Sequence, residues 1–90
     1  MPTQLVVATF RADTDMAEVF AVVAEEQAQV EHLTAEGRLG SIYLSLARST
    51  VFLETFGADA DDARAIVGAL PMSQWWDLDV FPLGAPEVAR

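Results

Sequence analysis

The stretch SIYLSLARSTVFLETF, residues 41–56, decides the fold of this 90-residue chain. Side chains alternate in character along residues 41–46 and again along residues 50–56, which is the period of a β-strand. Only residues 47–49 separate the two runs, and so short a connection joins antiparallel neighbours. The stretch therefore predicts a β-hairpin at the centre of the chain.

One strand and one helix precede this hairpin. Residues 4–10 are rich in β-branched side chains and apolar on both faces, as expected of a central strand. Residues 15–37 predict a long helix, because Asp15 and Glu18 have capping-box spacing and Gly37 is a suitable stop. The apolar stripe of this helix would be Met16, Val19, Phe20, Val23, Val30 and Leu33.

A second helix and a last strand follow the hairpin. Asp59 or Asp61 would cap a helix over residues 59–70, and Pro71 would end it. Its apolar stripe would be Ala63, Ile66, Val67 and Leu70. Residues 75–81 alternate again and predict the fourth strand.

The order strand, helix, strand, strand, helix, strand predicts a ferredoxin-like α+β fold. In this fold a four-stranded antiparallel sheet carries both helices on one face. We expect residues 1–90 to form a single domain with a short C-terminal tail at 84–90. The other sheet face stays uncovered, and in so small a domain we expect a second copy of the chain to cover it.

Strand alternation divides the side chains between the two faces of the sheet. The aliphatic sets around Ile42, Leu44 and Leu53 belong beneath the helices. The uncovered face would carry Tyr43, Ser45, Phe52, Glu54, Trp75, Asp77, Asp79 and Phe81. A short connection would pair Tyr43 with Glu54 and Ser45 with Phe52, whereas an even shift of register changes these partners and leaves the faces unchanged.

The carboxylates of the uncovered face are candidates for proton transfer. If a second sheet covers them, desolvation raises the pKa of Glu54 or Asp77 toward neutral pH, which suits general acid–base catalysis. Tyr43 would assist the transfer. The substrate-binding walls would be Phe52, Trp75, Phe81 and Ser45. Alternatively, these carboxylates are solvent-exposed on an edge strand and serve only to discourage aggregation. This alternative is strongest for Asp79.

Three side chains outside the hairpin and the last strand are also considered. Glu26 flanks the apolar stripe of the first helix and is a second candidate acid, although packing at the side of the helix would also account for it. Arg11 would receive a carboxylate of the ligand, or pair with Asp13. The only histidine, His32, lies opposite the stripe and should be exposed.

Composition excludes several classes of function. The net charge of −9 disfavours nucleic acid and anionic membranes as partners. The chain has no Cys, which removes thiolate metal sites and a cysteine nucleophile, and no Lys, which removes Schiff-base chemistry on a side chain. We expect no metal, no cofactor and no membrane span, and a cytoplasmic location.

Three segments resemble one known family. They are DTDMAEV at 13–19, LTAEG at 33–37 and, with the most specific pattern, LPMSQWWDLDVFPL at 70–83. Together they are similar to the muconolactone isomerase-like branch of the dimeric α+β barrel superfamily, over most of residues 4–83. The resemblance implies a bacterial homodimer that moves a proton on an unsaturated lactone without metal or cofactor. It also implies that Glu54, Asp77, Tyr43 and Trp75 could line the site.

We therefore expect a cofactor-independent isomerase that acts on an unsaturated lactone or an aromatic-derived substrate. Two alternatives stay open. One is a cofactor-free monooxygenase of polyketide tailoring, which belongs to the same superfamily. The other is a non-catalytic homo-oligomer that binds a ligand or has a purely structural role. A cavity of ligand size, on the order of 300 Å³ or more, left where two copies pair through the uncovered face and with Glu54 and Asp77 on its wall, would favour an enzyme or a binding protein.

Overall fold

The computed structural model of the chain describes residues 2–84, and the tail predicted beyond Gly84 lies outside the described residues. The strands are β1 (Thr3–Phe10), β2 (Leu39–Ser45), β3 (Thr50–Thr55) and β4 (Trp76–Leu83). The α-helices are α1 (Met16–Ala21), α2 (Val23–Ala35) and α3 (Ala60–Gly68), and two 3-10 helices are η1 (Leu46–Arg48) and η2 (Pro71–Trp75). The four strands form one antiparallel sheet in the order β2-β3-β1-β4.

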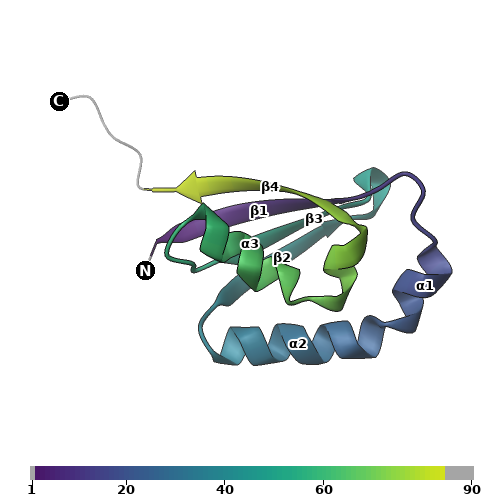
Figure 1. Cartoon of the computed structure of the whole chain (residues 1–90), viewed down its shortest axis with the longest axis horizontal. Helices are drawn as coiled ribbons and strands as arrows, with labels where there is room; N and C mark the ends of the chain where they lie inside the picture. Colours follow the sequence, from purple (N-terminus) through teal and green to yellow (C-terminus); the bar gives the residue numbers. More distant parts are fainter. Residues whose placement is uncertain (1, 85–90) are drawn as a thin grey trace.

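This arrangement confirms the predicted ferredoxin-like α+β fold. Helices α2 and α3 lie on the same side of the sheet (Figure 1). In the core, Val6 at the centre of β1 pairs with Leu53 on one side and Val80 on the other. The predicted stripe of the second helix is buried at all four positions, Ala63, Ile66, Val67 and Leu70. Asp59 caps α3, because its Oδ1 accepts a hydrogen bond from the backbone N–H of Asp62 at 2.8 Å.

The prediction of one unbroken helix over residues 15–37 is wrong. The helix breaks at Val22, whose ψ of 12° leaves the helical range and ends α1 after six residues. Val22 and Val23 are consecutive β-branched residues, which favour the helix less than the residues around them do. The chain bends between α1 and α2 as a result (Figure 1).

The hairpin forms as predicted, but its register differs by two residues. Tyr43 pairs with Phe52 rather than Glu54, and Ser45 pairs with Thr50 rather than Phe52. Because the shift is even, every face assignment in β2 and β3 stands. The turn is η1, and Ser49 closes it with a left-handed φ of 48°.

A β-bulge interrupts the other end of β2. Leu39 pairs with Thr55 and Ile42 with Leu53, so three steps along β2 match two along β3. The extra residue puts both Leu39 and Ile42 on the helix side of the sheet. The backbone N–H of Ser41, inside the bulge, donates to Oε1 of Glu54 at 3.0 Å.

The start of the last strand also needs correction. Strand β4 begins at Trp76, and Trp75 is the last residue of η2, so strand alternation does not place Trp75 on the uncovered face. Pro71 does not end α3, which stops at Gly68, but begins η2 instead. We call the uncovered side of the sheet the open face and define it by Tyr43, Ser45, Phe52, Glu54, Asp77, Asp79 and Phe81.

Within residues 2–84, the helices are too short and too polar for any of them to cross a lipid bilayer.

Candidate functional site

A cavity of about 440 Å³ lies on the helix side of the sheet, between α1, α2 and the β2–β3 hairpin. We call it the helix-side cavity. Its walls are Phe10, Met16, Val19, Phe20, Val23, Glu26, Gln27, Val30, Ile42, Leu44, Leu46, Val51, Leu53, Met72 and Trp76. Its volume falls within the range of small-molecule sites in proteins, about 300–1,000 Å³.

The cavity exists because the apolar side chains of the helix side do not close onto each other. Phe20 belongs to the predicted stripe of the first helix, yet it is 68% exposed. Leu44 faces the helices from β2, yet it is 58% exposed. The large apolar side chains that line the cavity while remaining exposed are Met16, Phe20, Ile42, Leu44 and Leu46. The open cavity therefore has an apolar rim.

Glu26 is the one ionisable side chain among the residues that line this cavity. It is only 9% exposed, although it is a carboxylate on the middle of α2. Its Oε1 accepts a hydrogen bond from the backbone N–H of Met72 in η2 at 2.9 Å. Burial raises the pKa of the Glu26 carboxyl above its usual value, and the hydrogen bond from Met72 offsets part of this rise.

The sequence contains a signal for this position that the apolar stripe alone does not reveal. Val23, Glu26 and Val30 follow one another at spacings of three and four residues, which puts all three on one face of α2. Because the valine-lined face of the helix packs toward the sheet, an acid on that face also points toward the sheet. Our prediction put Glu26 beside the stripe, whereas its low exposure puts it within the stripe.

Two other cavity residues carry polar atoms. Gln27 follows Glu26 on α2 and is exposed. Trp76 is buried at the start of β4, and its ring packs edge-to-face on Phe10 with the ring centroids 5.8 Å apart. Its Nε1 is shielded from solvent and has no hydrogen-bond partner among the described residues. The rest of the wall is apolar.

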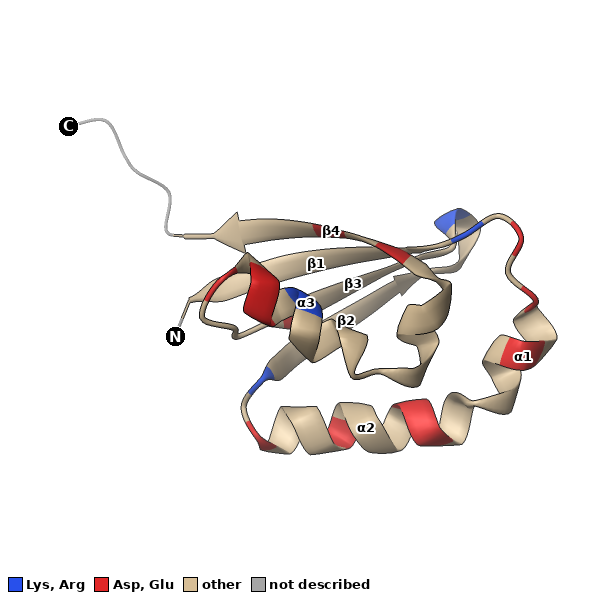
Figure 2. Cartoon of the chain, viewed as in Figure 1, with Lys and Arg blue, Asp and Glu red and all other residues tan. Residues whose placement is uncertain are grey.

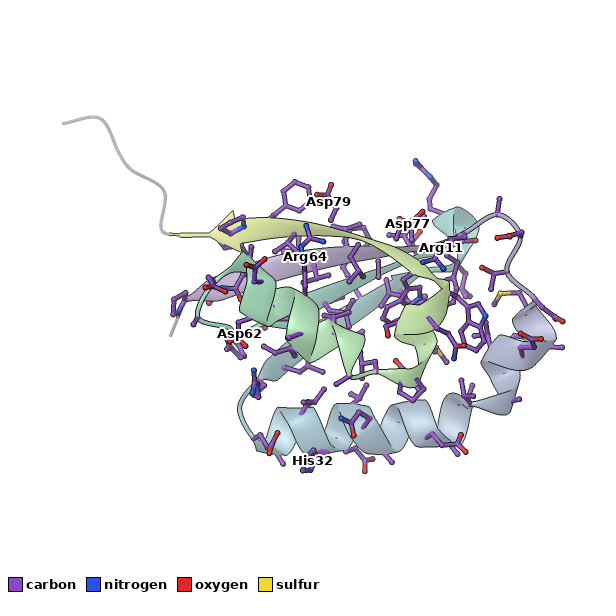
Figure 3. All side chains as sticks on the ribbon, viewed as in Figure 1. Arg11, His32, Asp62, Arg64, Asp77 and Asp79 are labelled. Atoms are coloured by element: carbon purple, nitrogen blue, oxygen red, sulfur yellow. The ribbon has the colours of Figure 1, made fainter. Side chains whose placement is uncertain are left out.

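Arg11 directly follows β1, and its guanidinium makes three hydrogen bonds to residues of η2 and β4. Its Nε donates to Oδ1 of Asp77 at 3.2 Å, Nη1 to the carbonyl of Gln74 at 2.6 Å, and Nη2 to the carbonyl of Trp76 at 3.1 Å. Arg11 thus pairs with Asp77 and not with Asp13, and the two side chains lie together in Figure 3. Arg11 fixes the start of β4 against β1.

The candidates on the open face lie across the sheet from Glu26. Glu54 and Asp77 are not brought together, because they pair with Leu5 and Thr9, four residues apart on β1. Four residues of strand span roughly 13 Å. None of the open-face residues lines the helix-side cavity. Tyr43, predicted to assist proton transfer, is 66% exposed, and Phe81, a predicted wall, is 46% exposed.

His32 takes no part in the cavity. Its Nε2 lies 3.4 Å from Oε2 of Glu36, one turn further along α2, and Figure 3 shows His32 on the side of α2 away from the sheet. This agrees with the predicted exposure. Among residues 2–84, no group of three or more His, Asp or Glu side chains is placed to hold a metal ion.

Comparison with known proteins gives one clear result. No curated protein matches the sequence significantly. Residues 5–87 match the family described as muconolactone delta-isomerase, which agrees with the resemblance carried by the segment at 70–83. Because this match spans nearly the whole sequence, the chain belongs to the muconolactone delta-isomerase family.

Proposed function

We propose that this protein is a cofactor-independent isomerase that moves a proton on an unsaturated lactone or an aromatic-derived carbonyl compound in the helix-side cavity. The observation that carries this proposal is Glu26, a nearly buried carboxyl in an otherwise apolar cavity of ligand size. Membership of the muconolactone delta-isomerase family supports it independently.

The proposed reaction needs one group that both takes and gives a proton. The Glu26 carboxylate would remove a proton from the α carbon of a β,γ-unsaturated lactone, or from the γ carbon of an α,β-unsaturated one, leaving a dienolate with its negative charge spread to the carbonyl oxygen. The neutral carboxyl would then return the proton to the other of these two carbons, so the double bond moves and nothing else is consumed. Because burial raises the pKa of Glu26, this carboxylate is a stronger base than an exposed one.

The open face has a separate place in the proposal. Tyr43 and Phe81 leave aromatic surface exposed there, beside the carboxylates of Glu54, Asp77 and Asp79. We propose that a second copy of the chain covers this face, forming a homodimer or a higher homo-oligomer. Glu54 and Asp77, with Tyr43, Ser45, Phe52 and Phe81, remain candidates for a site that such an assembly would create. Light scattering at low protein concentration tests the assembly.

The test of the reaction compares the wild-type protein with two glutamine variants. A panel of unsaturated lactones that includes muconolactone is incubated under argon, and isomerisation is followed by ultraviolet absorbance. Glu26→Gln keeps the shape and the hydrogen-bond acceptor for Met72 but cannot carry the proton. We expect it to lose at least about 100-fold in kcat, within the usual range for a general acid–base. Glu54→Gln tests the rival candidate on the open face and should retain nearly full activity if the reaction takes place in the helix-side cavity.

Full activity of Glu26→Gln with loss of activity in Glu54→Gln would move the reaction to the open face. Oxygen uptake on quinol substrates tests the monooxygenase alternative, which the aromatic walls Phe10, Phe20 and Trp76 favour. If the protein binds a ligand but turns over no lactone and no quinol, the non-catalytic ligand-binding alternative is supported.

A further inference from the structure

We infer that the helix-side cavity selects uncharged ligands and rejects carboxylates, so the substrate class is a neutral cyclic carbonyl compound rather than an anionic lactone. This inference rests on the proposed function for its reaction and deepens it. The observation behind it is the charge of the wall. Among the described residues, the wall contains one acid, Glu26, and no base.

No arginine among the described residues lines the cavity, where it could neutralise a ligand carboxylate. Arg11 is bound to Asp77 and to two backbone carbonyls of η2 and β4. Arg38 donates to Oδ1 of Asp62 at 2.9 Å, on the side of α3. Arg48 and Arg64 are exposed and lie outside the cavity wall. The chain contains no lysine.

The surroundings of the cavity act in the same direction. The sequence carries a net charge of −9, and Figure 2 shows acidic residues distributed over the helices and β4, with few basic ones. A carboxylate that entered would lose its hydration against the apolar rim, and it would approach the Glu26 carboxylate, a like charge, without a cation to compensate. A neutral carbonyl group meets neither penalty.

The turnover experiment uses two lactones that differ only in charge. One is 5-methylfuran-2(3H)-one, and the other carries a carboxymethyl group in place of its methyl group. Each isomerises to its conjugated form by the same proton shift. We expect kcat/KM to be higher for the methyl lactone by on the order of 30-fold. Salt of about 0.5 M screens the long-range field of the surface, and the preference should persist there because it arises inside the cavity.

The binding experiment does not depend on catalysis. Binding of 2-naphthol, which is neutral at pH 7, is compared with binding of 2-naphthoate, and amide chemical shifts of the cavity residues locate the ligand. Two single-charge variants on α2 are matched: Gln27→Lys places an ammonium group at the wall, and Ala28→Lys places one on the exposed surface outside it. Gln27→Lys should shift the preference toward the anion by on the order of 10-fold, and Ala28→Lys should not.

The outcomes separate this inference from the proposed function. If naphthol binds in the cavity more tightly than naphthoate and neither lactone is turned over, the selection of neutral ligands is supported and the proposed isomerase activity is contradicted. If the carboxymethyl lactone is turned over faster than the methyl lactone, the proposed isomerase activity is supported and the preference for uncharged ligands is contradicted. Equal or tighter binding of naphthoate by the wild-type protein, or binding of neither probe, also overturns it.

Discussion

Oε1 of Glu26 on α2 accepts a hydrogen bond from the backbone N–H of Met72 in η2, at 2.9 Å and across 46 positions of sequence. This bond connects the helix that forms one wall of the cavity to the segment that leads into β4. It also holds a carboxyl in a place where its charged form is poorly solvated. The same residue therefore joins two parts of the fold and supplies the acid of the cavity.

The first prediction concerns stability and pH. Because burial raises the pKa of Glu26 from the usual 4.5, the folded protein holds this proton more firmly than the unfolded chain does. The corresponding stability is complete below the unfolded pKa and is lost as pH rises through the folded pKa. Glu26→Gln keeps an oxygen for Met72 and removes this dependence. We expect the variant to gain stability relative to wild type as pH rises from about 4 to about 8.

Urea unfolding at several pH values measures this difference. Glu25→Gln, at the exposed neighbouring position, is the control and should follow the wild-type curve. A wild-type protein that stays more stable than Glu26→Gln at neutral pH, by a margin that grows with pH, would contradict the assigned direction. Glu26→Leu should instead lose about 1–3 kcal/mol at acid pH, because the half-buried N–H of Met72 then lacks its acceptor.

The second prediction separates the ion pair of Arg11 from its hydrogen bonds. Both side chains of the pair are accessible, 46% for Arg11 and 76% for Asp77, so the charge interaction contributes little. Asp77→Asn should cost less than about 0.5 kcal/mol. Arg11→Met also removes the donors to two backbone carbonyls and should cost about 1–2 kcal/mol in chemical denaturation. Equal losses for the two variants would show that the ion pair is the dominant interaction.

The third prediction concerns a buried amide at the opposite end of β1. Gln4 is 2% exposed, and its side chain donates to the carbonyl of Gly57 at 2.8 Å and accepts from Gly57 N at 2.9 Å. Its Oε1 also accepts from the hydroxyl of Thr55. Gln4→Leu leaves these groups buried without partners and should cost about 2–4 kcal/mol. Gln74→Leu, at an exposed glutamine, should cost less than about 0.5 kcal/mol in the same thermal unfolding assay.

The fourth prediction concerns the hairpin turn. Ser49 has φ 48° and ψ 44°, a left-handed conformation that costs a residue with a Cβ roughly 1–2 kcal/mol. Glycine avoids this cost but loses more backbone entropy on folding. The net effect of Ser49→Gly should be a gain of about 0.5–1 kcal/mol in the free energy of unfolding. Arg48→Gly, within η1, has no such strain to relieve and should destabilise the protein.

Strand and helix periods predicted much of this fold because they depend on local geometry alone. Alternation correctly assigned Tyr43 and Phe52 to one face, and the stripe that ends at Leu70 correctly identified the buried side of α3. Pairing partners were wrong by two residues, since alternation repeats every two positions and cannot distinguish one even register from the next. The predicted start of the last strand was one residue early, because Trp75 is the last residue of η2 and β4 begins at Trp76.

The candidate site was harder to predict for a different physical reason. Periodicity tells which side of an element a residue faces, but not how closely the next layer approaches. Phe20 and Leu44 face the helix side as predicted, but both remain exposed. The helical period of 3.6 residues does not reveal the break at Val22. The cavity arises because the layer of helices does not close onto the sheet. Glu26 was a candidate from the sequence, and the structure adds its burial and its bond to Met72.

The bulge in β2 has a consequence for how related chains should vary. Its extra residue leaves the N–H of Ser41 outside the regular ladder, and Glu54 accepts that N–H. A β-carbon at Gly40 would overlap this same carboxylate. Deletion of one residue here would restore a regular strand with Leu39 and Ile42 still on the same side. In an alignment of homologues, a gap at position 40 or 41 should therefore coincide with loss of an acceptor side chain at position 54. A residue larger than glycine at position 40 should also coincide with loss of that acceptor.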